Sequence, residues 1–587
     1  MFAMPKVTKS PFRSSLHANR SCRACDGCKV RKVKCDLATP KCSSCVAVDI
    51  NCTFTAPVRK RGPRPTRFPA PCDPGATING ELSYGARLTE DHAAVSVPDA
   101  PNQSPGSGPG LDILPTPPAI ASTQDFESDI AAIGKALLCG LGSPDNVDLL
   151  EEIMAGCSAA FFDKFYALDP LVHRRAFDMH CRQICQTLRQ HLLQGASLPT
   201  PLPAAMSVTP IDLAVVTAVC AKTLLMSPSE NPTSDPQWRE PMFQASRKAL
   251  AAYSEVELEN PTSGSIVARY IQTGYLHHIG KRNQSWLILG EAMRFAEVLN
   301  LHQKQAYEGD LDPWQRELRS RLFWILYTAD RSAGCIMRRV SSFCVNEAHE
   351  IDVPFPDESF DCAHSRESNG DPTELVSLSP IVGFNLNSRL WRQADLLFRE
   401  LQYLRHRCTV GNMKLEGQDY ARIRQLHVAF ETCLDSAPAA FQLPAVPLNT
   451  GSPHGGLPSG MIAVQSANIH VSFQCVRMRG LYAMAELCQA SGLNYPWGMV
   501  DISLTKIDLA RQMIQVVNSV SIESIKANGE SCAEKIRLTG AALLDVINGD
   551  SDPALIARAE AHLATVIHIL TSLNSKAVDA VTLEKAP

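Results

Sequence analysis

The chain has 587 residues, of which 45% are hydrophobic and 20% charged, so it is long enough for two or more folded domains and is not disordered throughout. Its net charge of −4 conceals a division, because residues 1–70 carry fifteen Lys and Arg against three Asp and Glu, whereas the rest carries 41 against 57. A basic head on an acidic body is expected where one end binds nucleic acid and the body must not adhere to it.

Neither secretion nor membrane insertion is expected. The first residues, MFAMPKVTKSPFRSS, contain no apolar signal-peptide core, and no run approaches the roughly 18 apolar residues of a membrane-spanning helix. Seven of the 21 cysteines lie between 22 and 52, and the other fourteen are scattered without pairing rhythm. We therefore expect a soluble intracellular protein whose scattered cysteines are reduced and buried.

Residues 1–21 form a basic tail without periodic apolar residues. Arg13 and Arg20, together with Arg23 just beyond the tail, are expected either to contact phosphates without regard to base sequence or to remain solvated.

The strongest pattern in the sequence is a cysteine repeat at 25–52, which reads CDGCKVRKVKCDLATPKCSSCVAVDINC. The spacing C-x2-C-x6-C occurs twice, first from Cys25 and again from Cys42. Zinc binds four thiolates in a tetrahedron, so two zinc ions need eight ligand positions, which six cysteines provide only if two thiolates bridge both ions. The leading cysteine of each half is the natural bridging residue. We therefore predict two Zn²⁺ ions bound by Cys25, Cys28, Cys35, Cys42, Cys45 and Cys52, with Cys25 and Cys42 bridging.

Three other uses of these cysteines fit the repeat less well. A register beginning at Cys22 would leave Cys28 without a role, and a four-cysteine zinc ribbon would leave Cys35 and Cys52 unexplained. A disulfide framework requires an oxidising compartment that the N-terminus does not indicate. Cys22 is therefore interpreted as a spare thiol.

The two halves of the repeat differ in charge. Between Cys28 and Cys35 the first half reads KVRKVK, whereas the matching span of the second half reads VAVDIN and has no basic residue. A metal site needs no such asymmetry, so we expect the cations to serve a partner, and four of them on a short segment suit the phosphate backbone of DNA. The candidate DNA-binding residues are Lys29, Arg31, Lys32 and Lys34.

This segment resembles the fungal binuclear zinc cluster, the Zn2Cys6 DNA-binding domain, in its cysteine spacing, its basic run, the Cys35-Asp36 pair and Pro40-Lys41. The resemblance implies that the short helix after the first cysteine pair enters the major groove at a CGG triplet, with Lys32 on guanine and the other three cations on or near phosphates. Lysine to guanine O6 and N7 is also a contact that groove chemistry favours. Residues 22–55 would then form the DNA-binding domain of a nuclear, sequence-specific regulator of RNA polymerase II genes.

Residues 56–122 are predicted to be a linker, basic at first and then rich in proline and glycine. The run RKRGPRPTR fits a nuclear localisation signal or an arm along the DNA backbone, and Pro63 interrupts the R-G-R-P core that minor-groove binding would need. Thirteen prolines fall between positions 53 and 120, so we expect a disordered segment without the coiled coil through which many relatives dimerise. Any homodimer should then form through the helical domain. The basic residues of the run are Arg59, Lys60, Arg61, Arg64 and Arg67.

From 123 to 587 the pattern is that of a large all-α domain. Apolar residues recur at steps of three and four from Trp286 to Leu299, with charged residues between them, as in an amphipathic helix. Pro, Gly, Ser and Asp gather in loops between the helical segments. Similar periods predict helices over 316–332, 387–407, 417–433, 461–490, 505–520 and 553–573, with loops at 227–240, 303–313, 354–378 and 440–460.

This region resembles the fungal transcription factor regulatory domain, also called the middle homology region. The similar stretches are FFDKFYALDPLVHRRAF at 161–177, SWLILGEAMRFAEVLNLH at 285–302 and RELRSRLFWILYTADRS at 316–332. The Gly-Arg-Pro common in the family a few residues later is replaced by Met337-Arg338-Arg339-Val340. The resemblance implies a pathway-specific regulator of carbohydrate use or of a secondary-metabolite gene cluster, acting on the transcription machinery.

Most conspicuous residues of the helical region are interpreted as structural. Trp286 and Trp324 are expected to anchor the core. His277 and His278 are adjacent on a predicted helix, point about 100° apart and are not expected to bind one metal ion. Ion pairs between helices are expected for Arg319, Arg321, Asp330 and Arg331.

No catalytic constellation is found, since G-x-S-x-G, GxxxxGK[ST] and H-E-x-x-H are all absent from the sequence. We therefore expect a transcription regulator and not an enzyme. Two other classes stay open: a ligand-binding receptor or enzyme-like helical domain with an accessory zinc cluster, and a zinc-dependent scaffold, for which the basic half would be unnecessary.

Overall fold

The computed structural model describes part of the N-terminal segment 25–53 and most of the chain from 123 to 573. The basic tail 1–21 and the predicted linker 56–122 lie outside the described residues. Within the first segment, residues 27, 29, 30, 32, 34, 39, 40 and 49 are not described. The later described ranges are 123–193, 208–227, 236–337, 339–341, 343, 351–354, 379–411, 414–443, 460–492, 501–549 and 551–573. The chain divides into two compact units, Met1–Gly110 and Leu111–Pro587.

The N-terminal unit is centred on sulfur. Four of its cysteines are fully buried, and the hydrophobic residues described in 25–53 that pack against them are Ile50 and the two remaining cysteines of the repeat. Helix α2 (Ser43–Val46) begins directly after Cys42 and carries Cys45 into this centre. A fold of this size buries too little apolar surface to be stable without a metal or disulfides.

The second unit is all-α in its described residues, as the sequence predicted. Its first group of helices is α3 (Thr123–Gly140), α4 (Val147–Ala160), α5 (Arg174–Leu193), α6 (Pro210–Met226), α7 (Arg239–Glu259), α8 (Ser263–His278), α9 (Arg282–Val298) and α10 (Pro313–Met337). The second group is α11 (Pro380–Val410), α12 (Gly417–Glu431), α13 (Gly460–Ser491), α14 (Ile502–Asn518), α15 (Ile522–Lys526), α16 (Gly529–Ile547) and α17 (Pro553–Ser572). Short turns of helix lie at Phe161–Phe165, Pro236–Trp238, Lys304–Tyr307 and Ala439–Phe441.

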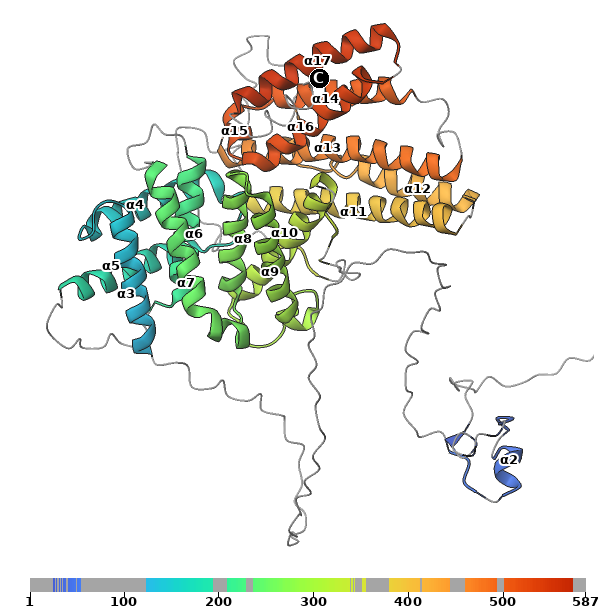
Figure 1. Ribbon diagram of the computed structural model, residues 1–587, viewed down its shortest axis with the longest axis horizontal. Coiled ribbons are helices and arrows are strands. Elements are labelled where there is room, and N and C mark those ends of the chain that lie inside the picture. The colour runs from blue at the N-terminus through green and yellow to red at the C-terminus, as the bar shows by residue number, and fades with distance from the viewer. Residues whose placement is uncertain are drawn as a thin grey trace, which may run out of the picture. The chain divides into compact units, whose positions relative to one another are not determined.

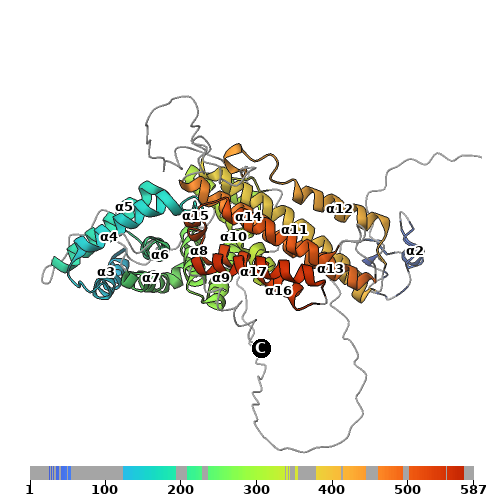
Figure 2. The same cartoon turned by 90° about the horizontal axis from the view of Figure 1, so that it is seen from above.

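The two groups form adjoining blocks. In Figure 1, helices α3 to α10 make one block, and the long helices α11 and α13 extend beside it. Figure 2 shows α11, α13 and α14 running along one another, and these helices also contact in the pairs α11 with α13 and α13 with α14. The blocks meet where α8 and α10 contact α16 and where α10 contacts α11.

Each block has its own apolar core. Phe162, Met293 and Trp324 are fully buried in the core of the first block. Helices α11 to α13 pack around Trp391, whereas α13 to α17 pack around Ile536 and its neighbours. Because long helix α13 contributes to both of these later cores, it connects the two layers of the second block.

Local sequence accounts for several helix starts. The Thr209 hydroxyl accepts a hydrogen bond from the Asp212 backbone N–H, and the Asp212 carboxylate accepts one from the Thr209 backbone N–H. Pro210 occupies the first turn of α6. Helix α16 starts at Gly529, where φ is +65° and an added Cβ would lie 2.6 Å from His278 Nδ1. A glycine is therefore required both by the backbone and by the close approach of α8.

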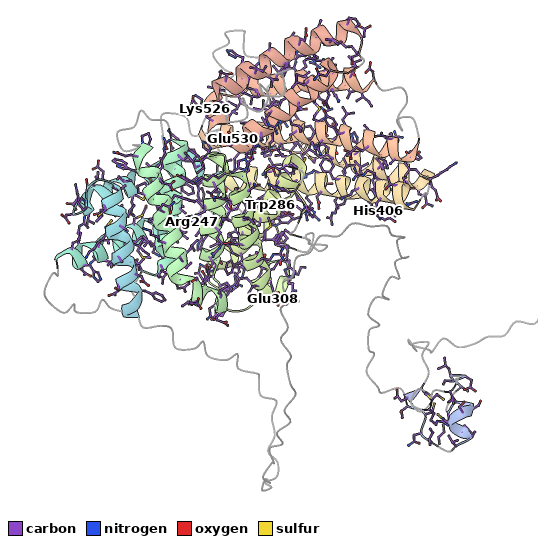
Figure 3. The ribbon with its side chains drawn as sticks, in the orientation of Figure 1. Arg247, Trp286, Glu308, His406, Lys526 and Glu530 are labelled. Carbon is purple, nitrogen blue, oxygen red and sulfur yellow. The ribbon has the colours of Figure 1, made fainter. Side chains whose placement is uncertain are left out.

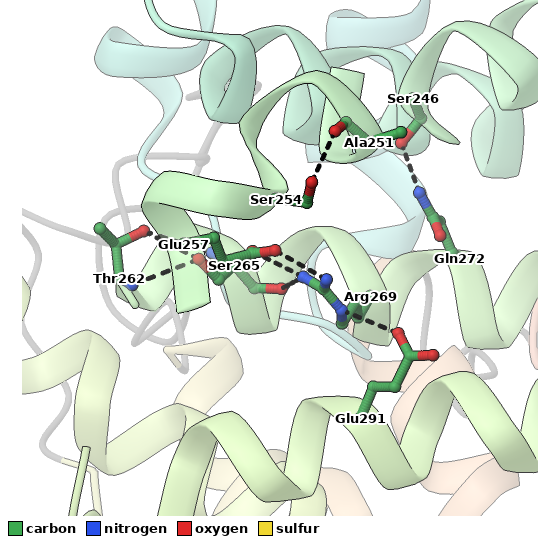
Figure 4. A network of polar contacts seen from close by, with 9 residues as sticks. All are labelled: Ser246, Ala251, Ser254, Glu257, Thr262, Ser265, Arg269, Gln272 and Glu291. Carbon is green, nitrogen blue, oxygen red and sulfur yellow. Dashed lines mark hydrogen bonds and ion pairs between the residues drawn. The ribbon is translucent and has the colours of Figure 1, made fainter. Parts of the chain in front are cut away.

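Buried charges are paired in the first block. Arg269 on α8 donates two hydrogen bonds of 2.7 Å to the carboxylate of Glu257 on α7 and one of 3.1 Å to Glu291 on α9 (Figure 4). Gln272, one turn further along α8, donates to the Ser246 hydroxyl at 2.8 Å. This network ties α8 to helices on both sides.

The predicted helices are confirmed, from the one over 286–299 to the one over 553–573, and each falls within or nearly within a helix of the structure. Trp324 is fully buried, as expected, but Trp286 is only partly buried and lines a cavity. Arg331 forms the expected ion pair between helices, with Asp395 at 3.1 Å. Arg321 instead pairs with Glu317 of its own helix and donates to the hydroxyl of Tyr166.

Among the described residues, α17 is long and apolar enough to cross a membrane by length and composition alone. Its apolar side chains Ala559, Leu563, Val566 and Leu570 are, however, fully buried in the core shared with α14 and α16. One face of α17 therefore packs into this core.

Candidate metal centre and nucleic-acid interface

Six cysteine sulfurs form two overlapping sets of four at the centre of the N-terminal unit. Within each set, all sulfurs lie within 4.8 Å of one another, and Cys25 and Cys42 belong to both sets. The other members are Cys28 and Cys35 in one set, and Cys45 and Cys52 in the other.

The sulfur spacing fits tetrahedral zinc. Cys25 Sγ lies 3.7 Å from Cys42 Sγ and 3.5 Å from Cys45 Sγ, and Cys28 Sγ lies 3.4 Å from Cys42 Sγ. A Zn–S bond of about 2.3 Å places neighbouring sulfurs of a tetrahedron about 3.8 Å apart. The distances exclude disulfides, and all six cysteines are free. The donor set is therefore suited to two thiolate-bound Zn²⁺ ions that share two sulfurs.

The backbone repeats along with the cysteines. Val33 N–H donates to the Cys28 carbonyl at 3.1 Å, and Ile50 N–H donates to the Cys45 carbonyl at the same distance. When the two copies of the cysteine repeat are aligned, Ile50 corresponds to Val33, and Cys45 corresponds to Cys28. The two halves thus share a turn that follows each C-x2-C pair.

The carboxylates of Asp36 and Asp26 accept hydrogen bonds that fix the connection between the two halves and join the ends of the unit. Asp36 accepts hydrogen bonds from the backbone and hydroxyl of Ser43, the first residue of α2. The Ser43 hydroxyl contributes most to lowering the pKa of Asp36. Asp26 N–H donates to the Thr53 carbonyl at 2.8 Å, and the Thr53 hydroxyl donates to the Asp26 carboxylate at 3.2 Å. These contacts close the unit around the sulfurs.

The thiols of the centre differ widely in pKa. The backbone N–H of Cys28 is the main cause that lowers the pKa of Cys25 to about 6. Burial raises the pKa of Cys28 to about 11 and those of Cys42 and Cys45 to about 12. Thiolates packed this closely need a cation to compensate their charge, which is what a bound Zn²⁺ supplies.

Among the candidate DNA-binding residues, the structure describes only Arg31. Its Nη2 donates to the Ser44 carbonyl at 2.9 Å and lies 3.6 Å from Cys45 Sγ and 4.0 Å from Cys28 Sγ. Arg31 therefore connects the two halves of the repeat, a role that its place in a basic run did not reveal. The candidates outside the described residues are Lys29, Lys32, Lys34, Arg59, Lys60, Arg61, Arg64 and Arg67.

In the part of the helical region that the structure describes, no further group of His, Cys, Asp or Glu side chains has metal-binding geometry. Burial lowers the pKa of His277, and it lowers that of His278 to about 4. These two histidines are therefore neutral at physiological pH.

Comparison with known proteins identifies both parts of the chain. The profile of the fungal Zn(2)-Cys(6) binuclear cluster domain matches residues 23–61, and that of the fungal specific transcription factor domain matches residues 159–403. The chain thus carries the two domains found in the fungal Zn2Cys6 transcription regulators, a family that does not comprise enzymes. Proteins of this class bind DNA and act on transcription.

Several relatives are regulators of single pathways. The chain is 23% identical over 374 residues to the citrinin biosynthesis transcriptional activators ctnR of Monascus purpureus and mrl3 of Monascus ruber. These alignments cover 58% of this chain and 57% and 65% of the relatives, so the chain spans less than two thirds of their length. It is also 51% identical over 46 residues to the maltose fermentation regulatory protein MAL13 of Saccharomyces cerevisiae, covering 8% of this chain and 10% of the relative.

Proposed function

We propose that this protein is a nuclear, sequence-specific regulator of RNA polymerase II genes that reads CGG-type triplets in the major groove. The observation that carries the proposal is the pair of four-sulfur sets sharing Cys25 and Cys42, built beside a half-repeat that holds four cations. In this proposal residues 22–55 form the DNA-binding domain and 123–587 the regulatory domain.

The metal assignment follows from the same geometry. We propose that two Zn²⁺ ions are bound by the six cysteines of the repeat, with Cys25 and Cys42 as bridging ligands. The ions would hold the two halves together, because the unit has little other core. Their loss should therefore abolish DNA binding by unfolding the unit.

Specific and general contacts are divided among the basic residues. We propose that Lys32 contacts guanine, that Lys29 and Lys34 lie on phosphates, and that Arg31 acts mainly by joining the two halves through Ser44. The run from Arg59 to Arg67 serves as a backbone arm or nuclear localisation signal. The proposal is tested by comparing the affinity of the zinc-loaded full chain for a CGG duplex and for a scrambled duplex at several salt concentrations.

The regulated pathway is proposed to be a secondary-metabolite gene cluster. The relatives that align over 374 residues are activators of citrinin biosynthesis, whereas the maltose regulator aligns over only 46 residues, too few to include the helical body. Carbohydrate use is therefore the weaker candidate. Transcript profiling of a strain with and without the gene would test this, and altered sugar-use transcripts alone would contradict it.

Any homodimer is proposed to form through the helical domain and not beside the cluster. The thirteen prolines between 53 and 120 leave no uninterrupted heptads for a coiled coil. We expect residues 1–122 to be monomeric in sedimentation and to bind single, direct or inverted CGG elements without a sharp optimum of spacing. A dimeric fragment, or one preferred inverted spacing, would contradict this.

A further inference from the structure

A cavity lies where the two blocks of the helical domain meet. Its volume is about 220 Å³, and its lining comes from helices α6, α8, α9, α10, α11, α13 and α16. Figure 3 labels two lining residues near this junction, Trp286 on α9 and Glu530 on α16. The volume corresponds to about seven water molecules, which is the size of a small metabolite and below that of most drug-sized pockets.

A buried ammonium group lies at this cavity. Lys535 on α16 is only 3% exposed, and its Nζ donates to the Ser472 hydroxyl at 2.8 Å and to Asn468 Oδ1 at 3.2 Å. The third neighbour is the ring of Trp391, whose centroid is 5.8 Å from Nζ. No described carboxylate forms an ion pair with Lys535, and burial lowers the pKa of its ammonium group.

Two other charged side chains at the cavity form ion pairs. Lys222 pairs with Asp169, and Glu534 pairs with Arg282. Lys535 is therefore the cation in this wall whose described partners are all neutral. A buried charge with neutral partners is costly, and a second charge of opposite sign would offset that cost.

Three residues that line the cavity each carry a buried polar atom without a hydrogen-bond partner among the described residues. These atoms are His277 Nε2 on α8, Thr328 Oγ1 on α10 and Asn387 Oδ1 on α11. Buried polar atoms are ordinarily satisfied, so atoms without partners around one cavity indicate something that occupies it. Water would satisfy these atoms but would not neutralise Lys535.

We propose that this cavity binds a small carboxylic acid bearing hydroxyl or amino groups. The carboxylate of the acid pairs with Lys535. The side chains of Asn387, Thr328 and His277 form hydrogen bonds with the rest of the molecule. Glu530, buried in the same wall, disfavours a second negative charge and favours a donor group there. Since the site joins α8 and α10 to α11, α13 and α16, an occupant would tighten the contact between the two blocks. The site stands independently of which DNA sequence the zinc cluster reads.

The test uses the full-length, zinc-loaded protein and thermal unfolding followed by tryptophan fluorescence. All six tryptophans lie beyond residue 230, so the signal reports on the helical domain and not on the zinc cluster. The probes are lactate, glycerate, serine, malate and glutamate at concentrations up to about 50 mM, each beside its amide. We expect at least one monocarboxylate to raise Tm by about 2 °C or more and its amide to have no effect.

Variants separate binding at this site from general ion effects. Lys535→Met should abolish the shift, and Thr328→Val, which removes a hydroxyl without a described partner, should weaken the acid's apparent affinity about tenfold without unfolding the domain. Lys526→Met, at a partly exposed side chain on α15 that pairs with Glu523, is the matched control and should leave the shift unchanged (Figure 3). If Lys535→Met does not fold, Thr328→Val decides. Any of the following results would overturn the proposal: no shift in Tm with any acid, equal shifts with acids and their amides, a shift that persists in Lys535→Met, or a shift that is unaltered in Thr328→Val.

Discussion

At the residue scale, the shared sulfurs separate the binuclear proposal from simpler metal sites. Cys42 belongs to both four-sulfur sets, whereas Cys52 belongs to one. Removing a shared ligand opens both coordination shells, while removing an unshared one opens a single shell.

We therefore predict different zinc contents for two serine variants of the full chain. The wild type should retain two zinc ions per chain after gel filtration, Cys52→Ser about one, and Cys42→Ser close to none, as measured by plasma mass spectrometry. Cys139→Ser, at an exposed cysteine outside the cluster, should keep two. Equal zinc content in Cys42→Ser and Cys52→Ser would speak against a bridging role.

Residues also mark the limit of what could be predicted from sequence. The six candidate zinc ligands could be predicted from the spacing of the cysteines, because two copies of one cysteine pattern in close succession have few other uses. Arg31 shows why the rest could not follow: in a basic run its charge suggested phosphate, yet its Nη2 bonds to the Ser44 carbonyl across the repeat. Asp36 was noted only as part of a motif, and its bonds to Ser43 depend on a turn that spacing does not encode.

At the element scale, the Arg269–Glu257 pair binds α8 to α7 in a buried setting. Glu257 is 1% exposed, and the guanidinium of Arg269 also stacks over the Phe295 ring at 4.4 Å. Breaking such a pair leaves an uncompensated buried charge, which typically costs far more than the loss of an exposed pair.

We predict that Arg269→Met lowers the free energy of unfolding of the helical domain by about 3–5 kcal/mol, measured by urea denaturation with tryptophan fluorescence. Arg294→Met, which removes an exposed pair with Glu297, should cost less than about 1 kcal/mol. Adding Glu257→Leu to Arg269→Met should restore part of the loss. A loss for Arg269→Met as small as that of Arg294→Met would show that the buried pair contributes little.

Helices themselves were predictable because three- and four-residue periods survive in each amphipathic segment, as in α9 and α10. The way in which the helices pack together could not be predicted. The cavity wall combines Lys535, Trp391 and His277 from three helices distant in sequence, and no local pattern indicates that they meet. The close approach of His278 on another helix, which is one reason for glycine at position 529, likewise has no local signal in the sequence.

At the scale of the whole molecule, buried neutral histidines make the helical domain sensitive to acid. Burial, followed by the charge of Lys222, lowers the pKa of His278 from 6.5 to about 4. The unfolded chain therefore binds a proton between these two values that the folded chain does not, so stability is complete above about pH 6.5 and declines as the pH falls toward 4.

We predict a loss of about 3 kcal/mol from His278 alone between about pH 6.5 and 4, since each pKa unit corresponds to about 1.4 kcal/mol. The free energy of unfolding, followed by tryptophan fluorescence at each pH, should decline less steeply in His278→Gln. His406→Gln, at an exposed site on α11, should follow the wild type (Figure 3). Identical pH profiles for His278→Gln and the wild type would contradict this account.

The molecule as a whole combines a small cysteine-rich head of positive charge with a large helical body of negative charge. In the proposed function the head reads DNA, and the negative charge of the body keeps the body off the DNA. The central claim is that the first half of the cysteine repeat reads base sequence and the second half serves the metal site.

The most direct test is the affinity of the zinc-loaded full chain and two variants for a CGG duplex and a scrambled duplex. Lys32→Ala should keep two zinc ions and lose about 1–3 kcal/mol of discrimination between the duplexes, whereas Arg61→Ala should weaken binding to both and flatten the salt dependence. If Lys32→Ala instead weakens binding to both duplexes equally, or if the wild type does not distinguish them, the first half of the repeat does not read sequence.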